Sequence, residues 1–128
     1  MRVLLDSHTL IWAVDNPGKL SVLAAATLQD PAIELVVSTA TVWEMAIKVG
    51  LGKLTLSIPF RDWMTQAIGG LETSLLQITV DHADAQAGLP LHHRDPFDRL
   101  MIAQAIVENM QIVSVDPNFD LYPIQRLW

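Results

Sequence analysis

Short apolar runs recur along the chain and predict buried strands. They lie at Val3–Leu5, Glu34–Ser38, Leu75–Ile78 and Ile112–Asp116. The cores of these runs are continuous rather than alternating, which is typical of parallel strands covered on both faces. A further edge strand is expected within Tyr122–Trp128. The pattern therefore favours a parallel sheet enclosed by helices.

Helical segments fill the intervals between these runs. They are expected at Ser7–Val14, at Ser21–Gln29, from a cap at Thr39 or Thr41 to Val49, from Ser57–Pro59 to Gly69–Gly70, at Asp81–Ala87 and at Pro96–Asn109, with a loop at Gly88–Arg94. Early prolines and closing glycines support several of these limits. The alternation predicts an α/β fold, a three-layer α/β/α sandwich with a mostly parallel central sheet. No linker or repeat interrupts it, so we expect one domain over residues 1–128.

The composition excludes several classes of protein. Hydrophobic residues form 51% of the 128 residues, charged residues form 17%, and mean hydropathy is +0.32, which excludes a disordered chain. The longest stretch without Asp, Glu, Lys or Arg is the ten residues Leu20–Gln29, too short to cross a membrane. The absence of cysteine excludes disulfides and thiolate chemistry and agrees with a cytoplasmic location.

Four acidic residues are expected at one edge of the sheet. Asp6 and Asp116 end strands, and Glu44 and Asp98 lie near helix starts that face the same edge. Buried carboxylates are costly unless they are paired or bind metal, and the chain has only eight Lys and Arg residues. Converging carboxylates without basic partners predict a Mg²⁺ or Mn²⁺ site. A single acid at a strand end or a helix start is usually a helix cap or a turn residue, but this explanation fits Glu44 poorly, because Glu44 falls inside a mostly apolar helix.

Four sequence blocks together resemble the PIN-domain ribonucleases, specifically the VapC-type toxins of toxin–antitoxin pairs. The blocks are Leu4–Trp12, Ser38–Lys48 around Trp43-Glu44, His93–Arg99 with Ile102–Ala105, and Ser114–Asp116 with Phe119. They occur in the family's order, and the His-Arg-Asp-Pro-Phe-Asp-Arg segment is the most specific. The resemblance implies an α/β/α sandwich that hydrolyses RNA phosphodiester bonds with Mg²⁺ or Mn²⁺.

The resemblance also implies roles for particular residues. The family's acidic quartet falls on Asp6, Glu44, Asp98 and Asp116, expected to be both catalytic and metal-binding. Ser114 fits the hydroxyl residue that the family places two positions before the last acid, and Asp95 either assists the site or caps a helix. The expected partners are an RNA substrate, a VapB-like antitoxin and a second copy of the chain. The alternative is a degenerate PIN-like module that binds RNA or protein without cleaving it.

Basic and aromatic residues near these blocks have two interpretations. Arg94 and Arg99 either hold RNA phosphates or neutralise the acids. His92 and His93 are interpreted as part of a solvated loop, with a phosphate or base contact as the functional alternative. His8 either lies near the site or is a satisfied residue at a helix start. For most of the four tryptophans, packing is favoured over base stacking.

The net charge at first argues against a nucleic-acid-binding protein. The chain carries −6 with an isoelectric point near 4.9, and four of the negative charges belong to the proposed metal ligands. Two divalent cations bound there would bring the formal charge from −6 to −2 and remove the local excess of negative charge. The charge balance therefore predicts weak RNA binding in the absence of a divalent metal and a pocket that a basic antitoxin segment can enter.

Overall fold

Five parallel strands form the central sheet of the computed structural model, which describes residues 1–128. The strands are β1 Arg2–Leu5, β2 Glu34–Ser38, β3 Ser74–Leu76, β4 Gln111–Val113 and β5 Arg126–Leu127. Their order is β3-β2-β1-β4-β5, and every pairing is parallel. The chain builds outward from β1 to β2 and β3, then returns to add β4 on the other side of β1. The carboxyl ends of β1 and β4 therefore flank the point where the winding reverses, which is where ligands bind in open α/β sheets.

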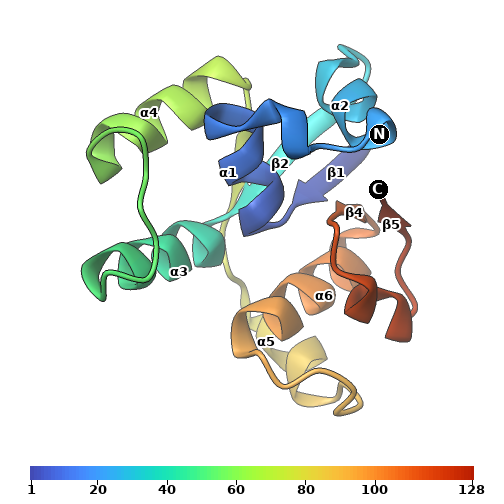
Figure 1. Cartoon of the computed structure of the whole chain (residues 1–128). Coiled ribbons are helices and arrows are strands. Elements are labelled where there is room, and N and C mark those ends of the chain that lie inside the picture. Colours follow the sequence, from blue (N-terminus) through green and yellow to red (C-terminus); the bar gives the residue numbers. More distant parts are fainter.

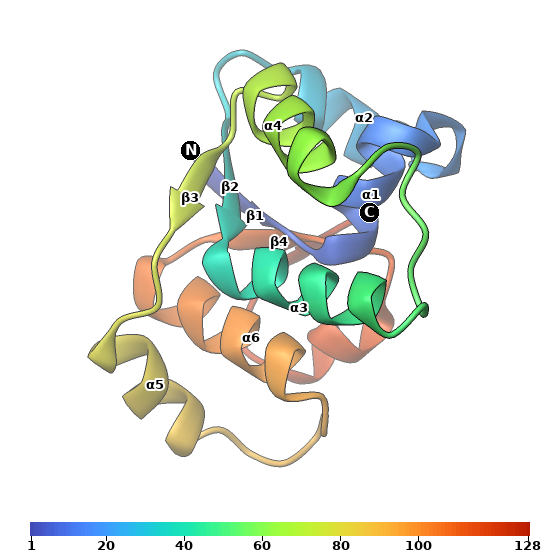
Figure 2. The same ribbon diagram turned by 90° about the vertical axis from the view of Figure 1, so that its left-hand side faces the viewer.

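Helices cover both faces of this sheet. They are α1 Ser7–Asp15, α2 Val22–Gln29, α3 Thr39–Gly50, α4 Phe60–Gly70, α5 Val80–Ala87 and α6 Pro96–Glu108, with short 3₁₀ helices at Pro17–Lys19 and Pro117–Leu121. Helices α1, α2 and α4 lie on one side of the sheet, and α5 and α6 lie on the other (Figures 1 and 2). The predicted three-layer architecture is confirmed. No helix in the chain combines the length and the apolar character needed to cross a membrane.

The sheet separates two hydrophobic cores. Val3 and Leu5 of β1 pack with Leu10 and Trp63 on one face, whereas Leu4 points into the cluster on the other. The second cluster joins Leu4 to Ile102, Ile112, Phe119 and Tyr122. Because successive side chains of a strand point to opposite faces, a continuous apolar run supplies both cores at once. This double burial accounts for the unusually high mean hydropathy.

Several predicted boundaries were wrong, and side-chain hydrogen bonds explain most of the differences. The strand expected at Ile112–Asp116 ends at Val113, because Ser114 bonds through its side chain to the neighbouring acids. The strand expected at Leu75–Ile78 is Ser74–Leu76. The cap of α3 is Ser38, whose hydroxyl accepts from the Ala40 amide at 3.1 Å.

The predicted cap at Ser57 was also wrong. Helix α4 begins at Phe60 after Pro59 and has no side-chain cap. Ser57 instead donates its hydroxyl to Asp15 at 2.6 Å and its amide to the same carboxylate at 3.1 Å. The residue therefore ties the segment before α4 to the end of α1.

Candidate metal centre

Asp6, directly after β1, is held by hydrogen bonds to both of its carboxylate oxygens. Its Oδ1 accepts from the Thr9 amide at 2.8 Å, which caps α1, and its Oδ2 accepts from the Ser114 hydroxyl at 2.5 Å. The residue is only 4% exposed. Asp6 is therefore a helix cap through Oδ1, and this capping bond fixes the direction in which Oδ2 points.

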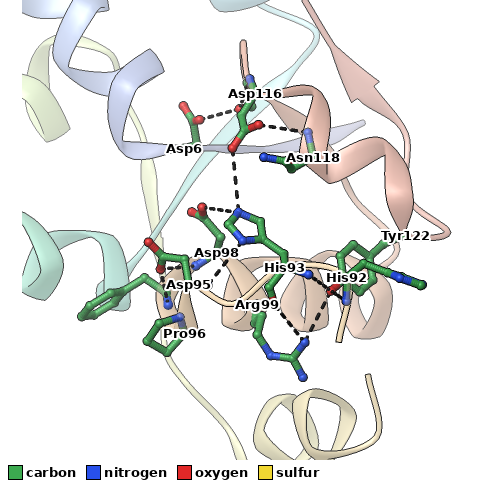
Figure 3. A network of polar contacts seen from close by, with 12 residues as sticks. Asp6, His92, His93, Asp95, Pro96, Asp98, Arg99, Asp116, Asn118 and Tyr122 are labelled. Carbon is green, nitrogen blue, oxygen red and sulfur yellow. Dashed lines mark hydrogen bonds and ion pairs between the residues drawn. The ribbon is translucent and has the colours of Figure 1, made fainter. Parts of the chain in front are cut away.

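Ser114 joins Asp6 to Asp116 across the centre of the sheet. Its buried hydroxyl donates to Asp6 and accepts from the Asp116 amide at 3.0 Å. Asp116 Oδ1 accepts from the Asn118 amide at 2.9 Å, which leaves Oδ2 directed toward His93 (Figure 3). As at Asp6, one carboxylate oxygen caps a helix; the second oxygen of Asp6 is bound by Ser114, whereas that of Asp116 faces His93.

Asp98 reaches the same place from the first turn of α6. Asp95 caps this helix, its Oδ1 accepting from the amides of Phe97 at 2.9 Å and of Asp98 at 3.2 Å. Pro96 supplies the helical φ angle at the first position without needing a hydrogen-bond partner for its nitrogen. The start of α6 therefore holds Asp98 in the site and places Asp95 at the edge of the site. Of the two roles expected for Asp95, the structure shows the helix cap.

Glu44 completes the group of acids from α3. It is 5% exposed, and its Oε2 lies 3.7 Å from Lys48 Nζ, one helical turn further along. The sequence argument that these acids lack basic partners was therefore wrong for Glu44. The acids Asp6, Glu44, Asp95, Asp98 and Asp116 all line one cavity of about 340 Å³.

The electrostatics of the cavity disfavour charged carboxylates in the absence of a cation. Burial, together with the nearby Asp95, Glu44 and Asp6, raises the pKa of Asp98 to about 7 against the opposing effect of His93. Burial also raises the pKa of Glu44, partly offset by Lys48. Clustered acids with raised pKa values are typical of functional sites rather than of structural ion pairs.

His93 lies inside the group of acids, where sequence reasoning did not place it. Its Nε2 is 2.9 Å from Asp98 Oδ2 and 3.8 Å from Asp116 Oδ2, and its side chain is 16% exposed. Its Nδ1 accepts from the Asp95 amide at 3.3 Å, so in a neutral ring the proton is on Nε2 (Figure 3). The prediction of a solvated loop holds for the exposed His92 and fails for His93.

A network around Arg99 and Tyr122 holds the His93 loop in place. The Arg99 guanidinium donates to the carbonyl oxygens of Pro90 at 3.0 Å and of His93 at 3.2 Å, among others. The Tyr122 hydroxyl accepts from the His93 amide at 2.9 Å and donates to the Pro90 carbonyl. Arg99 is thus turned to the loop backbone rather than to the carboxylates (Figure 3). Arg94 is exposed. The sequence offers one sign of this network: the polar loop at Gly88–Arg94 directly precedes the acidic residues Asp95 and Asp98.

The donor set suits a hard divalent cation. Single ligand atoms of His93, Asp98 and Asp116 lie within 4.8 Å of one another, and Asp6 adjoins Asp116 through Ser114. Carboxylate oxygens predominate, which is the chemistry that Mg²⁺ and Mn²⁺ prefer. The buried Nε2 of His93 makes no well-directed hydrogen bond despite the short distance to Asp98. With its proton on Nε2, the His93 ring offers no lone pair there, so the atoms that fit a cation in this arrangement are the carboxylate oxygens.

Comparisons with known proteins agree with this geometry. The model of the PIN domain matches residues 3–124. The ribonuclease VapC22 of Mycobacterium tuberculosis is 33% identical over 115 residues, which cover 89% of this chain and 86% of that protein.

Solved structures show the same fold at low sequence identity. The structure of VapBC2 from Rickettsia felis, bound to a DNA fragment from its promoter, matches with a TM-score of 0.73 at 14% identity over all of both chains. VapBC-1 from nontypeable Haemophilus influenzae matches with a TM-score of 0.69 at 19% identity over 98% of this chain and 96% of that one.

Proposed function

The chain belongs to the PIN-domain family, and we propose that it is a metal-dependent endoribonuclease toxin of the VapC type. The observation that carries the proposal is the convergence of Asp6, Glu44, Asp98 and Asp116 at the switch point of the sheet. The relative named ribonuclease VapC22 supports the reaction class. All four acids face one cavity, which favours an enzyme over a degenerate binding module.

The proposed cofactor is Mg²⁺ or Mn²⁺, held by Asp6, Asp98 and Asp116 with Glu44 as a ligand or a water-orienting base. Such an ion lowers the pKa of bound water and stabilises charge on a phosphate in the transition state. The protein's own contribution is to aim the carboxylates. Asp6 and Asp116 are oriented by their caps and by Ser114, and Asp98 is positioned by the Asp95 cap.

Water-assisted hydrolysis would leave a 5′-phosphate and a 3′-hydroxyl on the RNA products. His93, on a loop anchored by Arg99, would place its Nε2–H beside Asp98 and Asp116 and offset part of their charge. Pre-organised ligands need no rearrangement when the substrate arrives, which is the main way a protein contributes to such reactions.

Total RNA provides the direct test. Wild-type protein is incubated with total RNA in Mg²⁺, Mn²⁺ or EDTA, and the new ends are mapped. We expect cleavage with either ion, 5′-phosphate ends, and no cleavage in EDTA. Asp6→Asn removes a ligand while keeping the size of the side chain and is expected to abolish cleavage. Full activity of this variant would contradict the assignment.

The proposed regulatory partner is a VapB-like antitoxin, and the active form is proposed to be a homodimer in the cytoplasm. The matched solved structures are toxin–antitoxin complexes, which supports the partner. A basic side chain of the antitoxin can enter the acidic cavity and compete with the metal. Co-expression with the product of an adjacent short reading frame should suppress RNA cleavage, and gel filtration should give the size of two copies for the free protein.

A further inference from the structure

The acidic cavity adjoins a second cavity whose lining includes Lys48 and Lys53 beside apolar side chains. This neighbour has a volume of about 250 Å³ and shares Ser7, His8, Trp12 and Lys48 with the acidic one. Its far end is formed by Lys53 and Leu54. One groove therefore runs from the carboxylates, past Lys48, to Lys53.

The three lysines of the chain all gather around this groove. Lys48 and Lys53 line it, and Lys19 lies over the ring of Trp12, with Nζ 5.6 Å from the ring centroid. Three of the five arginines, in contrast, are committed elsewhere. Arg2 pairs with Glu34, Arg126 with Asp120, and Arg99 with loop carbonyls. In a chain with a net charge of −6, this grouping places positive charge directly beside the acidic cavity.

The end of α3 fixes the position of Lys53. The amides of Lys53 and Leu54 donate to the Lys48 carbonyl at 2.8 and 3.2 Å, so the chain turns back over the last turn of the helix. Gly52 supplies the positive φ of 72° that this reversal needs. The connection then runs up the side of the molecule toward α4 (Figure 2), where Ser57 binds Asp15 of α1. Both ends of this segment are anchored, and Lys53 is held at the groove.

We propose that this groove is a binding subsite for the RNA backbone, with Lys53 and Lys48 contacting phosphates next to the one that is cleaved. The inference rests on the proposed ribonuclease function. A substrate that spans several nucleotides must pass from the carboxylates to an adjoining surface, and the groove is continuous with them. Lysine ammonium groups bind phosphates as mobile point charges, and they offset the repulsion of RNA by the acids. Lys48 also partners Glu44, whereas Lys53 is exposed and tests the subsite more cleanly.

The experiment measures the affinity of Lys53→Ala for a fluorescein-labelled oligouridine across a series of salt concentrations. Asp98→Asn is present in every protein of this series to prevent cleavage. Loss of one phosphate contact on a single strand lowers the slope of log Kobs against log salt by about 0.7 in magnitude. Lys53→Arg should keep the original slope. Arg61→Ala, an exposed charge on α4, is the matched control and should leave the slope unchanged.

Kinetics in the otherwise native protein provide the second measurement. Lys53→Ala should raise KM for RNA several-fold and leave kcat unchanged, since Lys53 does not line the cavity that contains the carboxylates. A slope and a KM equal to those of Arg61→Ala would overturn the subsite while leaving the ribonuclease assignment intact. Loss of affinity for labelled oligoglutamate but not for oligouridine would assign the lysines to an acidic protein segment and overturn it too. If the wild-type protein neither binds nor cleaves RNA, the proposed function fails, and the subsite fails with it.

Discussion

Asp15 and Asp98 are both aspartates with several polar neighbours, yet their surroundings differ in kind. Asp15 accepts hydrogen bonds from the Ser57 hydroxyl at 2.6 Å, the Ser57 amide at 3.1 Å and Trp63 Nε1 at 2.9 Å. Burial opposes its charge, but these bonds outweigh burial and lower the pKa of Asp15. Asp98 is surrounded by other acids, and its pKa rises to about 7.

The difference separates a structural acid from one that we propose to bind a metal ion. At Asp15 every neighbour is a donor, so the protein itself stabilises the charge and gains a link between α1 and α4. At Asp98 the neighbours are mostly acceptors, so stabilisation must come from a bound cation or from a proton. Repulsion among clustered carboxylates lowers the stability of the folded protein, and such clusters are retained where function requires them.

Replacing Asp98 with asparagine should have the largest effect. We expect Asp98→Asn to reduce RNA cleavage by about 100-fold or more, since a first ligand contributes more than the roughly 10- to 100-fold typical of outer-shell partners. The metal-free variant should also melt at a higher temperature than wild type at pH 8, because one crowded carboxylate is gone. Initial cleavage rates and thermal melts check both parts. A variant that is less stable than wild type would remove the contrast with Asp15.

Ser114→Ala comes next. The variant leaves Asp6 Oδ2 and the Asp116 amide without their shared partner. Outer-shell losses typically cost roughly 10- to 100-fold in metal affinity or activity. Calorimetric titration with Mn²⁺ should show the weaker site, and Ser114→Thr should restore part of the affinity. Unchanged Mn²⁺ affinity in the alanine variant would show that the hydroxyl does not orient the site.

Asp15→Ala should affect stability and leave chemistry alone. It removes the acceptor for buried Trp63 Nε1 and for Ser57, so we expect a loss of about 1–2 kcal/mol in the free energy of unfolding. Urea denaturation measures the loss, and kcat below the melting transition should match wild type. A large fall in kcat with the fold intact would mean that the two acids are not independent.

The smallest effect is a difference in pH dependence between the two acids. A raised pKa in the folded state means that Asp98 holds its proton longer than in the unfolded chain, so its contribution to stability declines as pH rises from about 4 to about 7. Asp15 has a lowered pKa, so its contribution is present above pH 3.8 and is lost on acidification. Unfolding free energies of the metal-free protein across pH 3–8 should show both trends. Asp98→Asn should flatten the first, and Asp15→Asn the second.

Strand and helix assignments were largely readable because they depend on local patterns. The apolar runs at β1 and β2 and the Pro96 start of α6 are visible without knowledge of the fold. Boundaries failed where a backbone amide donates to a side chain instead of to the backbone, as the Asp116 amide does to Ser114 and the Ser57 amide does to Asp15. The bonds from Ser57 to Asp15 and from Ser114 to Asp6 join residues distant in the sequence, and no local pattern records them.

In the candidate site, too, some features follow from the sequence and others from the fold. The sequence by itself determined that acids follow the strands, because a buried parallel strand ends in a polar residue at the point where the helices no longer cover the sheet. Only the tertiary structure decided which neighbours they have. It brought His93 between Asp98 and Asp116 through a loop held by Arg99, and it brought Lys53 back over Lys48. Electrostatic energy depends on the distances between charged groups, and these groups lie far apart along the chain. The sequence therefore identifies which ionisable residues are present, and the fold determines how strongly they interact.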